Sequence, residues 1–175
     1  MITVDPSNKS NGTLNAWLNS TCAPFVVVTD SVDISEEWQT EPNKKWLIID
    51  GKDMPDWPST FRILTEVFQL PDYFGNNLNA LDECLSDSDV LQGGAFVVQI
   101  LNASVTLNAD GPDGLPALMN CFLRIAEELA KPISLSEPGD RPAIPFHVLL
   151  CDVGTVPRLA GYLPVPESPP PETPR

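Results

Sequence analysis

Apolar residues form several short runs of strand length along the chain. Residues 46–50, 96–101 and 146–151 are almost continuously apolar, a pattern typical of strands that are buried on both faces of a sheet. Residues 25–29 are rich in β-branched side chains and predict a further strand. We expect this fourth strand to add to the edge of the main sheet.

Between these runs, apolar residues recur at helical spacing in three segments. The first, 57–70, follows Asp56, a residue suited to cap a helix. The second follows a loop around Gly75, a residue that can take a positive φ where the chain turns sharply, and ends at about residues 86–89. The third follows the turn-forming residues 110–114 and ends before Pro132. Alternating strands and helices predict an α/β fold, with a small parallel sheet of about three strands, the extra edge strand, and three or more packing helices.

Composition divides the chain into three parts. Residues 1–43 predict an N-terminal extension with a strand, a short helix at 13–19 and a helical turn at 35–38; residues 43–45 predict a polar break. Residues 44–154 predict the main domain, and 155–175 a proline-rich tail that is disordered or polyproline-II-like. The N-terminus lacks the apolar segment of a signal peptide, and no apolar run has membrane-spanning length. We therefore expect a cytoplasmic protein.

The chain is strongly acidic, with a formal net charge of −14 and a pI of about 4.2. This charge argues against nucleic acid as a direct partner, because phosphate binding needs lysine and arginine. It suits a basic protein partner, although an acidic balance that serves only solubility, as in many bacterial cytosolic proteins, remains an alternative. No Lys, Arg or His occurs between Arg62 and Arg124, so the acidic residues of that window are unopposed in sequence.

No residue pattern in the chain predicts catalysis. The four cysteines are widely spaced and there is one histidine, so we expect no metal site and no cofactor. Cys84, Cys121 and Cys151 lie in apolar surroundings and predict buried structural thiols. His147 lies inside a predicted strand, which favours a core histidine over a catalyst. The sequence therefore predicts a protein that is not an enzyme.

The most informative stretch is LPDYFGNNLNALDECL, which spans residues 70–85. It resembles the barstar family, intracellular inhibitors of secreted ribonucleases. WLIIDG at 46–51 and PFHVLL at 145–150 resemble the strands that flank this motif in the family, so the resemblance spans about residues 46–152. It implies a three-stranded parallel sheet packed by helices, with the motif's loop and helix on one exposed side.

The resemblance also implies contacts with a nuclease. Tyr73 stands at the family's loop tyrosine, and Glu83 takes the place of the aspartate that enters the phosphate site, one methylene longer. Asn79 replaces the family's usual aspartate, and Asp82 stands where the founding member has a tryptophan. The candidate partner-binding residues are Tyr73, Asn77, Asn79, Asp82, Glu83, Ser86 and Asp87.

Two of these assignments stay open. Asn77 falls towards the apolar side of the predicted helix, so a structural hydrogen bond is at least as good an explanation as partner contact. The family draws a further acidic contact from its third helix. Glu127 and Glu128 are near that position, whereas Arg124 or Ile125 aligns more simply.

Together these features predict an inhibitor that binds the active site of a basic ribonuclease, for self-protection or for immunity against a secreted or delivered toxin. Carboxylates on a rigid helix would replace the phosphate of RNA, and we expect a monomer when the partner is absent. The alternative is a binding or regulatory module on the same scaffold with a non-nuclease partner. An enzyme would instead require a deep pocket lined by perturbed titratable groups.

Overall fold

A parallel four-stranded sheet forms the centre of the computed structural model, which describes residues 18–21, 25–27, 41, 43–86, 94–134 and 140–151. The strand order is β1-β4-β3-β2, and every pairing is parallel. The strands are β1 (Phe25–Val27), β2 (Lys44–Asp50), β3 (Ala95–Leu101) and β4 (Phe146–Leu150). The α/β class is confirmed, and β1 is the extra N-terminal edge strand that the sequence predicts.

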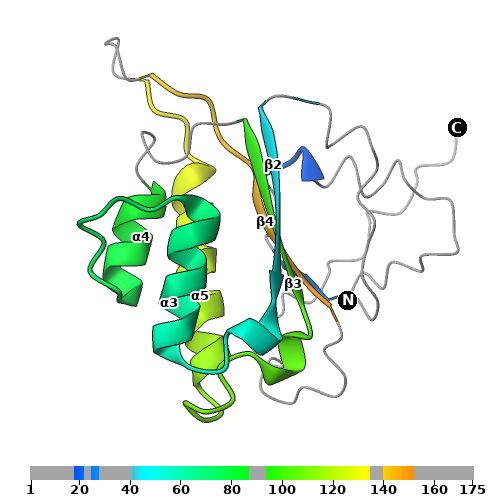
Figure 1. The fold of residues 1–175 in the computed structure, drawn as a ribbon. Helices are drawn as coiled ribbons and strands as arrows, with labels where there is room; N and C mark the ends of the chain where they lie inside the picture. Colours follow the sequence, from blue (N-terminus) through cyan, green and yellow to red (C-terminus); the bar gives the residue numbers. More distant parts are fainter. Residues whose placement is uncertain are drawn as a thin grey trace, which may run out of the picture.

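Three α-helices lie on one side of this sheet (Figure 1): α3 (Trp57–Phe68), α4 (Leu78–Ser86) and α5 (Gly114–Leu129). Two short 3₁₀ turns, η1 (Gly51–Asp53) and η2 (Ala103–Val105), follow β2 and β3. α3 and α5 contact the sheet, whereas α4 packs chiefly on α5 and lies farthest from the strands (Figure 1). α4 is therefore an outer helix with one face available to solvent.

Local sequence explains where these helices begin. The Asp56 carboxylate accepts a hydrogen bond from the Ser59 backbone N–H at 2.9 Å, which confirms the predicted cap of α3. Pro58 lies in the first turn of α3 and Pro116 in the first turn of α5, where the missing N–H leaves no helical hydrogen bond unmade.

The core lies between the sheet and the helices. The phenylalanine at the start of β4, Phe146, packs against Phe96 of β3, Phe122 of α5 and Phe68 of α3, with ring centroids 5.9–6.5 Å apart. Burial of one such side chain contributes roughly 1.5–3 kcal/mol. This cluster fixes α3 and α5 on the sheet, and α5 in turn supports α4.

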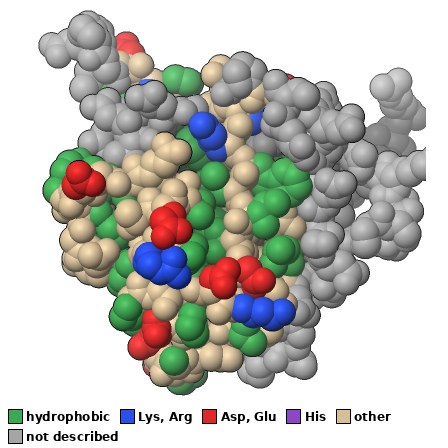
Figure 2. Space-filling model, in the orientation of Figure 1, with side chains coloured by type: hydrophobic (Ala, Val, Ile, Leu, Met, Phe, Trp, Pro, Cys, Tyr) green, Lys and Arg blue, Asp and Glu red, His purple; other side chains and the backbone are tan. Residues whose placement is uncertain are grey.

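The interpretation of residues 46–50 as a strand buried on both faces is wrong. Among the described strands, β2 pairs only with β3 and is the last in the order, and Ile48 is 52% exposed. Leu47 and Ile49 pack on the core from the other face. The predicted polar break at 43–45 is also wrong, because Lys44 and Lys45 belong to β2. Figure 2 shows hydrophobic side chains at the surface on both sides of the β2 backbone.

Several smaller expectations have outcomes in the described residues. Cys84, Cys121 and Cys151 are buried thiols that form no disulfide within the described part of the chain. His147 is a buried core residue whose Nε2 shares a 2.8 Å hydrogen bond with the Ser20 carbonyl. No helix in the described ranges combines the length and apolar character that crossing a membrane requires. Most of the predicted helix at 13–19, the turn at 35–38, Cys22, Asp87 and the tail lie outside the described residues.

Candidate functional site

The loop before α4 holds one tyrosine out in solvent. Leu70 and Phe74 are buried, and the Phe74 ring meets Phe61 of α3 edge-on with centroids 6.0 Å apart. The Phe74 N–H also donates to the Pro71 carbonyl at 2.9 Å. Tyr73 lies between these anchors and is 77% exposed. The loop is thus fixed from below while it presents a large aromatic ring outward.

Asn77 caps the N-terminus of α4. Its Oδ1 accepts from the Ala80 backbone N–H at 2.9 Å, and its Nδ2 donates to the Gly75 carbonyl at 3.0 Å. The Asn77 carbonyl accepts the first helical hydrogen bond, from Leu81. Both polar atoms of the side chain therefore have partners inside the molecule. This geometry favours the structural explanation that the sequence left open.

Gly75 does not adopt the positive φ that glycine allows at this turn. The left-handed residue is the next one, Asn76, with a φ of 49°, and asparagine adopts this conformation more readily than most residues. A Cβ atom on Gly75 would lie 3.0 Å from Nδ2 of Asn77. Glycine is thus suited to this position because it leaves room for the cap.

α4 has one buried face and one open face. Leu81, Cys84 and Leu85 are buried, which agrees with the apolar stripe in the sequence. Asn79 and Glu83 are exposed on the other side. Asp82 and Ser86 are half-buried at the boundary between the two faces. The helix therefore presents Glu83 to solvent and turns Asp82 towards its neighbour α5.

An open groove of about 610 Å³ runs between α4 and α5. It brings together four of the seven candidate residues with side chains from α5 and the residues that follow it. Tyr73 and Asn77 do not line it. The lining residues are Asn79, Asp82, Glu83, Ser86, Arg124, Glu127, Glu128 and Lys131. Glu127 and Glu128, the nearby acidic candidates of the third helix, thus share a groove with the candidates of α4.

The groove contains four carboxylates and two cations, which gives a net charge of −2. Arg124 Nε lies 3.0 Å from Asp82 Oδ2, and Lys131 Nζ lies 2.7 Å from Glu128 Oε2. Among the described residues, Glu83 and Glu127 form no ion pair. The acidic window of the sequence is therefore partly neutralised in space, since the cation that meets Asp82 is 42 residues away.

Three ionisable groups in or under the groove have shifted pKa values with clear causes. The hydrogen bond from Lys131 lowers the pKa of Glu128, and the same contact raises the pKa of Lys131. Under the groove, burial raises the pKa of the Cys121 thiol to about 12, and the nearby Asp82 charge adds to this effect. Cys121 Sγ lies 3.4 Å from the Leu78 carbonyl, which joins α5 to the start of α4. This thiol is structural.

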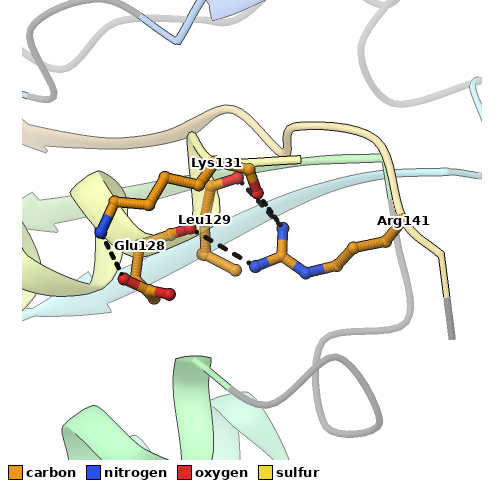
Figure 3. Close-up of polar contacts among 4 residues, drawn as sticks. All are labelled: Glu128, Leu129, Lys131 and Arg141. Atoms are coloured by element: carbon orange, nitrogen blue, oxygen red, sulfur yellow. Dashed lines mark hydrogen bonds and ion pairs between the residues drawn. The ribbon is translucent and has the colours of Figure 1, made fainter. Parts of the chain in front are cut away.

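A buried arginine holds the end of α5 in place (Figure 3). Arg141 Nη1 donates to the Leu129 and Lys131 carbonyls at 3.1 and 3.3 Å, and Nη2 donates to the Glu128 carbonyl at 3.4 Å. A cation at this end of a helix satisfies its last carbonyls and opposes its dipole. Arg141 thereby fixes the turn that carries Glu128 and Lys131 into the groove. No sequence pattern pointed to this role, because the contacts depend on the path of the loop before β4.

The groove is open, and its charged groups lie at the surface. No three or more His, Cys, Asp or Glu residues in the described part of the chain are grouped to hold a metal ion. An exposed aromatic ring, exposed carboxylates and a supported backbone are features of a surface that binds another protein.

The comparison with known families agrees with this geometry. The family described as Barstar (barnase inhibitor) matches residues 44–151, which is more than half of the chain. The match runs from the first residue of β2 to the residue after β4, and so it includes α3, α4, α5 and the whole groove. A comparison with curated proteins gives no match. The chain belongs to the barstar family.

Proposed function

We propose that this chain inhibits a basic ribonuclease by covering its active site with the inhibitory surface, defined as Tyr73, Asn79, Asp82, Glu83, Ser86 and Asp87. The observation that carries the proposal is the position of Glu83, which is exposed on α4 and forms no ion pair among the described residues. Asp87 follows α4 directly and lies outside the described residues. Membership of a family described as barnase inhibitors supports the same function.

The chemistry of the target explains why a carboxylate suits this role. A ribonuclease cleft binds a phosphodiester, and so it offers cationic hydrogen-bond donors. Glu83 would accept those bonds in place of the phosphate, and charge-assisted bonds of this kind are shorter and stronger than neutral ones. The acidic groove around it would accelerate encounter with a basic enzyme.

The support beneath this surface reduces the entropy lost on binding. The Asn77 cap and the buried Phe74 hold the loop and the start of α4 before the partner arrives. A preorganised surface loses less conformational freedom when it docks. Tyr73 would add a contact with few rotatable bonds and both apolar and polar character, as is common in energetically important interface residues. Asn77 acts in this proposal by shaping the surface rather than by direct contact.

The same surface would serve two biological settings. It would silence the cell's own secreted ribonuclease before export, or a ribonuclease toxin delivered by a competitor. Either task takes place in the cytoplasm, and we propose that the free protein is a monomer there.

Inhibition of RNA cleavage tests the proposal directly. The panel consists of barnase and the ribonucleases encoded in the same genome, above all one encoded beside this chain. We expect stoichiometric inhibition of at least one basic member, with competition by substrate RNA. If none of these enzymes is inhibited and the chain instead binds a neutral or acidic non-nuclease protein, the alternative of a regulatory binding module replaces this proposal.

A further inference from the structure

Arg124 places a positive charge inside a surface that otherwise suits a phosphate mimic. Its side chain comes from α5, lines the groove together with Glu83, and is 52% exposed. The other groove cation, Lys131, is paired within its own chain segment to Glu128, three residues away. Arg124 is instead paired across the groove, to Asp82 on α4.

The ion pair between Arg124 and Asp82 leaves part of the guanidinium for another group. The contact joins one arginine nitrogen, Nε, to one carboxylate oxygen at 3.0 Å. A guanidinium has five N–H donors in a planar fork, and a carboxylate can accept two of them side by side. Half of the Arg124 side chain is open to solvent. Besides the ion pair, Arg124 forms a side-chain hydrogen bond with the Cys121 thiol, and two contacts leave part of the five-donor fork for an acceptor from a partner.

A partner that covers this groove changes the environment of Arg124. Burying a guanidinium is unfavourable unless new acceptors replace the lost water. A partner that placed only lysine and arginine here would also bring like charges together, which opposes association. A partner that placed a carboxylate here would satisfy the exposed part of the fork. Selection against the wrong partner is a common source of specificity in charged interfaces.

We propose that Arg124 selects the partner: the ribonuclease that fits this surface carries a carboxylate opposite Arg124, beside the basic groups that meet Glu83. This inference rests on the proposed function. The groove is then a site of mixed charge. It contains Arg124 together with Glu83 and Glu127, two carboxylates that form no ion pair among the described residues. A ribonuclease whose whole contact surface is cationic would bind less well, although the inhibitor is acidic overall.

Whether Arg124→Gln strengthens or weakens binding to the ribonuclease tests this assignment. Arg124→Gln makes the groove more negative by one charge. If the partner surface there is cationic, dissociation constants must fall; if it carries a carboxylate, they must rise, by about tenfold or more. We would measure them for wild type, Arg124→Gln, Arg124→Glu and Arg124→Lys against the ribonuclease panel, using the enzyme that wild type inhibits most strongly.

Arg62→Gln is the matched control. Arg62 is exposed and paired with Glu66 at 3.2 Å on α3, outside the groove, so its loss changes net charge by the same amount. We expect Arg124→Glu to weaken binding more than Arg124→Gln, and Arg124→Lys to retain part of the affinity. Urea denaturation of each variant would separate altered folding from altered contact.

Each result has a distinct meaning. If Arg124→Gln binds more tightly than wild type, or only as Arg62→Gln does, the carboxylate assignment is overturned while the ribonuclease-inhibitor function stands. If no ribonuclease is bound through Glu83, the proposed function fails and the present inference fails with it. If Arg124→Glu regains affinity when a carboxylate of the ribonuclease is changed to lysine, the facing group is identified.

Discussion

Replacement of Asn77 by alanine separates a helix cap from a partner contact. The substitution removes the acceptor for the Ala80 N–H and the donor to the Gly75 carbonyl. Loss of an asparagine cap costs about 1 kcal/mol, within a range of roughly 0.5–2. The second bond lies at the surface and contributes roughly 0.5 kcal/mol. We therefore expect Asn77→Ala to lower the free energy of unfolding by about 1–2 kcal/mol.

Urea denaturation followed by circular dichroism measures this loss. The urea midpoint should fall while the m-value stays unchanged, because the substitution does not change how much surface becomes exposed on unfolding. Asn79→Ala is the matched control: it is the same substitution two residues along, where the side chain is exposed and alanine favours the helix. Asn77→Asp keeps the acceptor at the positive end of the helix dipole and should retain most of the stability.

The affinity of the same variants completes the test. If Asn77 only shapes the surface, Asn77→Asp should inhibit the ribonuclease nearly as well as wild type. The cap explanation is refuted if Asn77→Ala unfolds at the same urea concentration as Asn79→Ala but inhibits the ribonuclease at least tenfold less well than wild type does. That result would make Asn77 a direct contact.

Three further substitutions probe the support and the chemistry of the site. Arg141→Ala should lower the free energy of unfolding by about 2–3 kcal/mol, because it leaves carbonyls at the end of α5 without their charged donor; an unchanged urea midpoint would contradict this role. The free energy of unfolding should fall as pH rises from about 9 towards 12, because the unfolded Cys121 thiol ionises near its ordinary pKa of 9.0 while burial keeps the folded thiol protonated up to about 12. Urea denaturation at pH 8 and 10 should show a smaller loss of stability for Cys121→Ala than for wild type. An equal loss in both proteins would contradict this effect. Tyr73→Ala should leave stability within about 0.5 kcal/mol of wild type but weaken inhibition by more than about 1 kcal/mol, and equal inhibition would exclude Tyr73 from the interface.

The fold was predictable because local patterns and burial agree along most of the chain. The apolar runs at 96–101 and 146–151 correspond to β3 and β4, whose residues are almost all buried. The run at 46–50 looks the same in sequence, yet β2 is an edge strand with Ile48 exposed. Strand order depends on contacts between distant segments, so an apolar run alone does not distinguish a central strand from an edge strand.

The site was predictable at its local features and not at its long-range ones. The spacing of Leu81 and Leu85 fixed which face of α4 is buried, and therefore which side carries Glu83. The ion pair between Arg124 and Asp82 joins residues 42 positions apart and carried no signal in spacing or composition. The sequence also did not show that Asn76, rather than Gly75, adopts the positive φ, because either residue can do so.

The effect of Glu83→Ala on the dissociation constant for the inhibited ribonuclease tests the central claim most directly. Glu66→Ala, which removes an exposed glutamate on α3 outside the groove, is the matched control. Since Glu83 is expected to replace a phosphate, its loss should cost about 2 kcal/mol or more, which is roughly a thirtyfold weaker complex. Glu83→Gln should weaken binding to a similar degree because the charge is lost, whereas Glu66→Ala should change it little. Equal dissociation constants for wild type, Glu83→Ala and Glu66→Ala would contradict the claim that this carboxylate occupies the phosphate site.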